Sequence, residues 1–160
     1  MRPALPATHT DMISPLFYAT NLLESLGNRY IFNPVGLTAT SFKILSALKK
    51  RRETPSAILF QVGGLKSNLS QRLRALETKG LIRRFRRSRS DKRKIFFELT
   101  KNGKHLLQQA ETYAKHARLS FEKEFTPAEL KQHKAFFAKL LSLLTKKETS
   151  LQKHFCVKRK

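Results

Sequence analysis

The apolar residues change their spacing part-way along the chain, and few small folds accommodate that change. The first pattern is a helical stripe of leucines at Leu65, Leu69, Leu73 and Leu76. Beyond Gly80, three apolar residues alternate as they do in a strand with one buried face: Ile95, Phe97 and Leu99. Residues 82–87 can pair with this strand, with residues 88–92 as the connection. The sequence therefore predicts an antiparallel hairpin directly after a helix that ends at Gly80.

Positive charge is concentrated in the same part of the chain. The 160 residues include 33 Lys and Arg but only 11 Asp and Glu, which gives a net charge of +22. Residues 66–94 alone hold 12 Lys and Arg against 2 acids. A basic run by itself is often only a solvated surface or a localisation signal. Together with the helix and the hairpin, it favours a polyanion as the partner.

Other helices are predicted on both sides of this region. Their starts are marked by threonines that can act as N-caps: Thr38, Thr54, Thr100 and Thr126. An earlier helix is expected from Asp11 to about Gly27, the Thr38 helix should run through Lys50, and a turn should follow at residues 51–53. The last helix, to about residue 145, is apolar on more than one face, so it needs two partners. The second of these is expected to be another subunit.

The predicted order is helix, short helix, polar-faced helix and basic hairpin, which is a winged helix-turn-helix. The leucine stripe would seat the third of these helices on the lobe. Its opposite side carries small hydrogen-bonding residues and one arginine: Ser67, Ser70, Gln71, Arg74 and Thr78. Such side chains can read base edges in a major groove. The hairpin arginines can bind phosphates or enter a minor groove. The fold class is therefore mainly α, with a small β-hairpin wing.

Four motifs, taken together, resemble the MarR family of bacterial and archaeal transcription regulators. They occur in the order Gly36-Leu37-Thr38, Leu76-Glu77-Thr78-Lys79-Gly80-Leu81-Ile82-Arg83-Arg84, Asp91-Lys92-Arg93 and Leu99-Thr100-Lys101-Asn102-Gly103. The resemblance covers about residues 11–145. The length of 160 residues predicts one domain, over residues 1–160. Within it, the resemblance implies dimerisation helices at 11–30 and 101–145 and a DNA-binding lobe at 37–100, followed by a basic tail at 146–160.

The resemblance also implies a homodimer that binds a palindromic operator, most simply as a repressor in the cytoplasm, associated with the nucleoid. The implied recognition-helix contacts are Lys66, Ser67, Asn68, Ser70, Gln71 and Arg74. The implied wing contacts are Arg87, Arg89, Lys92 and Arg93. Asp91 would brace the wing. A small anionic or phenolic effector would bind between the dimerisation layer and the DNA-binding lobe, near Phe17, Tyr30, Phe42 and Arg84.

The sequence departs from the family pattern in the helix-turn-helix. Ala57-Ile58-Leu59 stands where Glu-Leu-Ala is frequent, and Gly63-Gly64 replaces a single turn residue. Gln71 occupies a position where the family often has arginine. Glutamine pairs well with adenine and arginine with guanine, so the preferred operator is expected to differ.

Other classes find little support in the sequence. The single cysteine, Cys156, and the five scattered histidines give no metal-ligand spacing, and no catalytic motif or membrane-spanning run is present. We therefore expect neither an enzyme nor a bound cofactor. Two alternatives stay open. One is a sequence-tolerant nucleoid or RNA-binding protein, and the other is a module whose wing binds an acidic protein.

Overall fold

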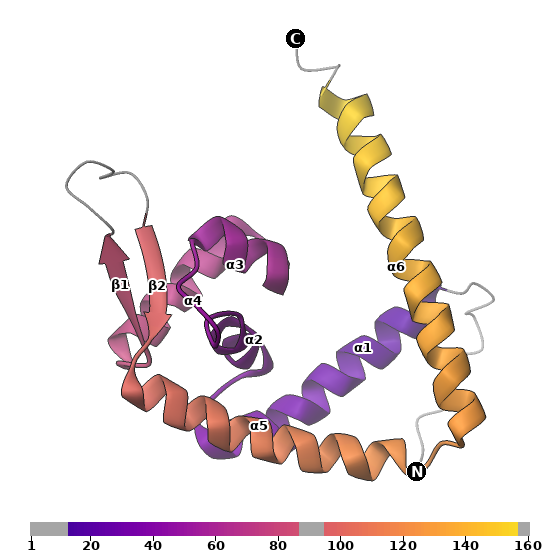
Figure 1. Cartoon of the computed structure of the whole chain (residues 1–160), viewed down its shortest axis with the longest axis horizontal. Helices are drawn as coiled ribbons and strands as arrows, with labels where there is room; N and C mark the ends of the chain where they lie inside the picture. The colour runs from indigo at the N-terminus through magenta and orange to yellow at the C-terminus, as the bar shows by residue number, and fades with distance from the viewer. Residues whose placement is uncertain (1–12, 87–94, 157–160) are drawn as a thin grey trace. The chain divides into compact units, whose positions relative to one another are not determined.

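The computed structural model describes residues 13–86 and 95–156 (Figure 1). Its helices are α1 (Ile13–Gly27), α2 (Ala39–Ala47), α3 (Pro55–Val62), α4 (Lys66–Thr78), α5 (Lys101–Glu122) and α6 (Pro127–Cys156). Its two strands, β1 (Ile82–Arg86) and β2 (Ile95–Leu99), form one antiparallel hairpin. This confirms the mainly α fold with a β-hairpin wing. The chain divides into two compact units, residues 1–116 and 117–160, which are described separately.

The core of the first unit lies where α2, α3, α4, the hairpin and α5 meet. Its largest fully buried side chains are Ile44, Leu45, Ile58, Ile82 and Leu107. β1 contacts α4, and β2 contacts α3. Apolar residues recur at helical spacing in the helices and at alternate positions in the strands, so each element presents one face to this core.

The leucine stripe of α4 is confirmed at three positions and wrong at the fourth. Leu69, Leu73 and Leu76 are buried, but the side chain of Leu65 is 68% exposed. The reason lies in the backbone. Leu65 is the N-cap of α4 and has an extended conformation (φ −94°, ψ 144°), so the helical period does not include it. The first helical residue is Lys66.

A third extended segment joins the edge of the hairpin. Residues 51–53 were expected to form only a turn, yet Glu53 pairs with Phe97 of β2 through backbone hydrogen bonds of 3.1 and 2.8 Å. This pairing buries Glu53 and ties the α2–α3 connection to the wing.

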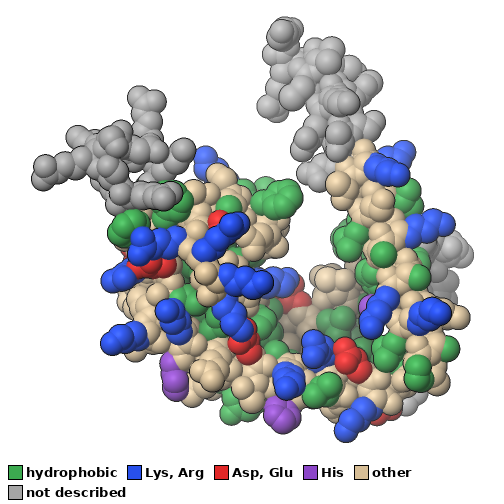
Figure 2. All heavy atoms as spheres, in the orientation of Figure 1, with side chains coloured by type: hydrophobic (Ala, Val, Ile, Leu, Met, Phe, Trp, Pro, Cys, Tyr) green, Lys and Arg blue, Asp and Glu red, His purple; other side chains and the backbone are tan. Residues whose placement is uncertain are grey.

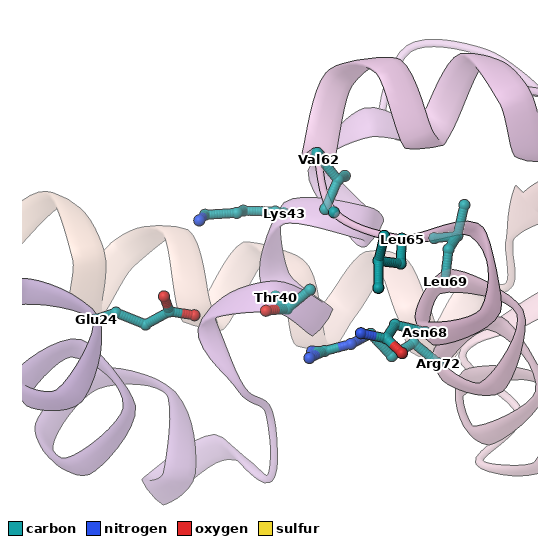
Figure 3. Close-up of a pocket in the computed structure, with 10 residues that line it drawn as sticks. Glu24, Thr40, Lys43, Val62, Leu65, Asn68, Leu69 and Arg72 are labelled. Atoms are coloured by element: carbon teal, nitrogen blue, oxygen red, sulfur yellow. The ribbon is translucent and has the colours of Figure 1, made fainter. Parts of the chain in front are cut away.

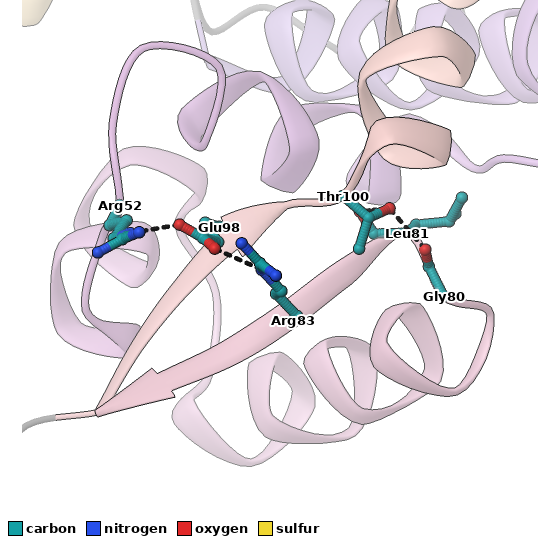
Figure 4. Close-up of polar contacts among 6 residues, drawn as sticks. All are labelled: Arg52, Gly80, Leu81, Arg83, Glu98 and Thr100. Atoms are coloured by element: carbon teal, nitrogen blue, oxygen red, sulfur yellow. Dashed lines mark hydrogen bonds and ion pairs between the residues drawn. The ribbon is translucent and has the colours of Figure 1, made fainter. Parts of the chain in front are cut away.

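Close backbone packing joins the hairpin to the start of α5. The Thr100 hydroxyl donates to the Gly80 carbonyl at 2.6 Å, and the Thr100 backbone N–H donates to the Leu81 carbonyl at 3.1 Å (Figure 4). A Cβ atom added to Gly103 would lie 1.9 Å from the Leu81 oxygen. Only glycine fits at this position, so the root of the wing rests directly on α5.

The first α-helix ends at Gly27 as expected, but turns of other helical types continue beyond it. A π-helical turn follows at Asn28–Phe32, and a 3-10 turn follows at Asn33–Val35. Gly27 keeps helical dihedral angles and is buried against the Phe32 ring, which would lie 3.3 Å from a Cβ there. The chain turns only at Gly36, whose φ of 72° favours glycine.

The second unit contains the end of α5 and all of α6, which begins with the predicted capping box. The Thr126 backbone N–H donates to the Glu129 carboxylate at 2.7 Å, and the Glu129 N–H donates to the Thr126 hydroxyl at 3.3 Å. The carboxylate also accepts a hydrogen bond from the Thr126 hydroxyl at 2.8 Å, and the two bonds that it accepts, from the Thr126 N–H and then from the hydroxyl, lower the pKa of Glu129. The helix continues to Cys156, past the expected end near residue 145. Within one chain it leaves large apolar side chains exposed: Phe136, Leu141, Leu143 and Leu144.

Candidate nucleic-acid interface

Helix α4 carries the candidate recognition surface. The six side chains that the sequence predicts as DNA contacts are all exposed on it: Lys66, Ser67, Asn68, Ser70, Gln71 and Arg74. The buried leucines hold the opposite face of the helix against the core. Gly80, with a φ of 67°, ends the helix and turns the chain into β1. The helix thus holds polar side chains in fixed positions, which the reading of base edges requires.

Contacts at the sides of α4 fix its orientation. The Lys79 ammonium donates to the Gly36 carbonyl at 3.4 Å. On the hairpin, Arg84 Nη2 lies 4.0 Å from Glu77 Oε2, and the Arg84 guanidinium carbon lies 5.7 Å from the centre of the Phe97 ring. These contacts join α4 to the loop before α2 and to the wing.

A row of charged side chains crosses the outer face of the wing (Figure 4). Glu98 of β2 accepts hydrogen bonds from the Nε atoms of Arg52 and Arg83, one on each carboxylate oxygen. The Arg52 guanidinium also lies 4.0 Å from the centre of the Phe85 ring. The Arg52 hydrogen bond, and then that of Arg83, hold the pKa of Glu98 below its usual value although desolvation opposes the shift. Sequence reasoning missed this row because Arg52 joins it only through the Glu53–Phe97 pairing.

The charge excess of the sequence is visible on the surface. Lys and Arg side chains predominate over acidic ones on the face drawn in Figure 2. Among the described residues, Glu53, Glu77 and Glu98 on or beside the strands of the wing each pair with arginine, as Glu53 does with Arg51 at 2.7 Å. Such a surface attracts polyanions at long range.

A small hollow adjoins the first turn of α4. Its volume is about 200 Å³, and its lining comes from α1, α2 and the α3–α4 turn as well as α4. Figure 3 shows its polar side chains, which include Glu24, Thr40, Lys43, Asn68 and Arg72. Neither Lys43 nor Arg72 makes an ion pair within the described part of the chain. The hollow therefore presents two cations that are free to bind an anionic group.

The four residues predicted to line an effector pocket do not line this hollow. Phe17 and Tyr30 are exposed, at 67% and 65%. Phe42 stacks on Phe32 with ring centres 4.8 Å apart, and Arg84 makes the contacts described above. The structure thus places the four apart from the hollow, and their role in binding a ligand stays a prediction.

The predicted wing contacts and the bracing residue lie outside the described residues: Arg87, Arg89, Asp91, Lys92 and Arg93. The strands on either side of them are described, because β1 ends at Arg86 and β2 begins at Ile95. The side chain of Cys156 also lies outside the description. Within residues 13–86 and 95–156, no three His, Cys, Asp or Glu side chains gather as a metal site would require.

Comparison with known protein families shows which class of protein this chain belongs to. The model of the family described as transcriptional regulator SarA/Rot matches residues 28–110, which span the π-helical turn, the helix-turn-helix, the hairpin and the first half of α5. The chain belongs to the SarA/Rot family of transcriptional regulators. No curated protein matches the sequence at a significant level.

Solved structures confirm that this SarA/Rot regulator has the winged-helix fold of MarR proteins. A mutant MarR from E. coli in complex with operator DNA is 23% identical, with a TM-score of 0.69 over 82% of this chain and 99% of that one. BpsR of Bordetella bronchiseptica, whose DNA binding is regulated by 6-hydroxynicotinic acid, is 17% identical, with a TM-score of 0.73 over 87% and 99%. NadR in complex with 4-hydroxyphenylacetate is 22% identical, with a TM-score of 0.66 over 86% and 96%.

Family membership confirms the predicted class of the protein. The SarA/Rot regulators, like the MarR proteins that share their fold, are DNA-binding transcription regulators. No described helix is long and apolar enough to span a membrane. The protein that carries the polar face of α4 and the wing is therefore a transcription regulator.

Proposed function

We propose that the protein is a dimeric, sequence-specific repressor that binds a palindromic operator through α4 and the wing. The observation that carries the proposal is the seating of α4, with three leucines buried and six predicted contact residues exposed. Side chains held in this way can discriminate base pairs by bidentate hydrogen bonds. Occupying a promoter then blocks transcription without any catalytic step.

Uncovered apolar surface supports the dimer. Large side chains are exposed on α1, as at Phe17 and Leu23, and on α6, as at Leu141 and Leu144. A stable monomer seldom leaves so many large apolar residues in water. A twofold dimer would bury them and place two α4 helices about 34 Å apart, one helical turn of DNA. Sedimentation equilibrium tests this point, and a monomer at micromolar concentration contradicts it.

The DNA-binding test uses a duplex selected by the protein from a random library. At about 150 mM salt, the selected duplex should bind at least about a thousandfold more tightly than a scrambled duplex of equal length. Gln71→Ala and Arg74→Ala should each reduce that ratio about fivefold or more. Lys104→Ala on α5 removes one positive charge outside α4 and serves as the matched control. Equal binding to both duplexes would refute the proposal.

The high net charge favours a second candidate, a sequence-tolerant nucleoid or RNA-binding protein. With 33 Lys and Arg against 11 acids, the chain can bind any nucleic acid through phosphates alone. This candidate predicts steep salt dependence and the same affinity for selected and scrambled duplexes. Single-stranded RNA, tested beside duplex DNA, separates its two forms.

A small aromatic carboxylate is the proposed effector, and the hollow beside α4 is its proposed site. Lys43 and Arg72 can bind the carboxylate, while Val62 and the exposed Leu65 offer apolar surface for a ring. The hollow also contains Asn68, a predicted DNA contact, so an occupant would compete with DNA. The relatives bound or regulated by 4-hydroxyphenylacetate and 6-hydroxynicotinic acid support this chemical class.

The effector test measures release of the selected duplex by each of these two acids. Release should weaken when Lys43 and Arg72 are both changed to alanine, provided that the variant still binds the duplex. Lys104→Ala is again the control. If neither acid releases DNA, or if the double variant responds as the wild type does, the effector site is not this hollow.

A further inference from the structure

The recognition helix α4 differs from α2, α3, α5 and α6 in its N-cap residue. Among α2 to α6, four helices begin with a threonine whose hydroxyl accepts a hydrogen bond from a backbone N–H in the first turn: Thr38, Thr54, Thr100 and Thr126. The N-cap of α4 is Leu65, whose side chain makes no cap hydrogen bond. Leucine is among the poorest N-cap residues, because it leaves the N–H groups of the first turn without a side-chain acceptor. The chain therefore forgoes a stabilising cap at this one position.

Leu65 does not compensate by packing in the core. Its side chain is 68% exposed, whereas Leu69, one turn later, is 4% exposed. Leu65 therefore contributes neither a side-chain cap nor core packing to α4. In natural proteins, residues that break the local rules of capping and packing occur mostly at functional sites.

The surroundings of Leu65 indicate what it contacts. It directly precedes Lys66 and lies with Asn68 and Arg72 along the same hollow (Figure 3). The surface is continuous with the predicted DNA-reading face of α4 and carries positive charge, so a nucleic acid fits it better than an apolar protein. The apolar group that a B-DNA major groove offers is the 5-methyl of thymine.

We propose that Leu65 contacts the 5-methyl group of a thymine in the operator and thereby makes one base pair specific for thymine. The inference rests on the proposed function, because it requires a preferred DNA sequence. It adds an apolar element to the polar contacts of α4. The α4 N-terminus, which enters the groove first in helix-turn-helix proteins, is the end that bears Leu65.

The test replaces the thymines of the selected duplex by deoxyuridine, one position at a time. This removes a single methyl group and keeps every hydrogen bond of the base pair. One replacement should weaken binding of the wild type about three- to fivefold, the value of one buried methyl group. Leu65→Ala should bind the thymine duplex more weakly by a similar factor and should no longer distinguish thymine from deoxyuridine at that position.

Two further variants separate contact from folding. Leu65→Ser supplies the missing cap and should raise the melting temperature, yet it should lose the discrimination as Leu65→Ala does. Phe60→Ala removes another exposed apolar side chain, 91% exposed on α3, and should keep the discrimination at the same thymine. The inference is overturned if the wild type binds every deoxyuridine duplex as tightly as the parent. It is also overturned if Leu65→Ala or Leu65→Ser keeps the wild-type ratio.

Different results would refute the proposed function and the Leu65 contact. If the wild type does not prefer the selected duplex over the scrambled one, the proposed function fails and the inference falls with it. If the preference is strong but no thymine methyl contributes through Leu65, only the inference fails.

Discussion

Replacing Gly103 by alanine tests the packing that holds the wing on α5. Helix propensity alone predicts that Gly103→Ala stabilises the protein by about 1 kcal/mol. The structure predicts the opposite, because the new Cβ would lie 1.9 Å from the Leu81 carbonyl oxygen, and contacts under 3.0 Å are essentially never seen. The hairpin root or the helix must therefore move by about 1.1 Å, the difference between these two distances.

That movement has a cost that can be worked out roughly. It would weaken the Thr100 hydrogen bonds to Gly80 and Leu81, about 1 kcal/mol each, and add about 1–3 kcal/mol of overpacking. After subtracting the propensity gain, Gly103→Ala should lower the free energy of unfolding by about 2–4 kcal/mol. For a chain of this size, the melting temperature should then fall by about 4–16 °C.

The assay is thermal unfolding followed by circular dichroism, with all samples at one protein concentration because a dimer melts in a concentration-dependent way. Lys104→Ala, at the next position of the same helical turn, is the control and should change stability by less than about 0.5 kcal/mol. If Gly103→Ala melts at or above the wild-type temperature, the close approach between Gly103 and Leu81 does not exist as described.

Two further predictions concern a helix cap and the charged row on the wing. Thr38→Ala removes the acceptor for the Ser41 N–H at 3.1 Å and should cost about 1 kcal/mol in chemical denaturation, whereas Thr38→Ser should cost much less. Glu98→Gln should destabilise the protein at neutral pH, because the pKa of Glu98 is lowered by Arg52 and Arg83 and the ionised pair stabilises the fold. A lowered pKa contributes its full stability above the unfolded value and loses it as the pH falls through the folded value, so the difference between Glu98→Gln and wild type should shrink as pH falls below about 4.5. A difference that is constant from pH 7 to pH 3 would mean that the carboxylate charge contributes nothing.

Local patterns in the sequence were enough to predict most of the fold. The threonine caps, the glycine at residue 80 and the alternation at residues 95–99 each act within a few residues, so they could be read without tertiary information. The exposed face of α4 followed in the same way, because the helical period assigns Leu69, Leu73 and Leu76 to one side and Gln71 and Arg74 to the other.

The features that the sequence did not predict have long-range or conformational causes. Glu53 pairs with Phe97, 44 positions away, and this pairing also brings Arg52 to Glu98, so no local pattern could reveal either contact. Leu65 fits the apolar period, but its extended backbone removes it from the helix. The hollow beside α4 brings Lys43 to Arg72 through the packing of separate helices, which sequence spacing does not report.

Sequence-specific DNA binding is the central claim, and one competition measurement tests it most directly. The full-length protein is titrated into a fluorescent duplex selected from a random library, at about 150 mM salt, with scrambled duplex as competitor. If binding is sequence-specific, about a thousandfold excess of scrambled DNA is needed to displace half of the labelled duplex, and Gln71→Ala reduces this excess about fivefold or more. Half-displacement by an equimolar amount of scrambled DNA would contradict this claim.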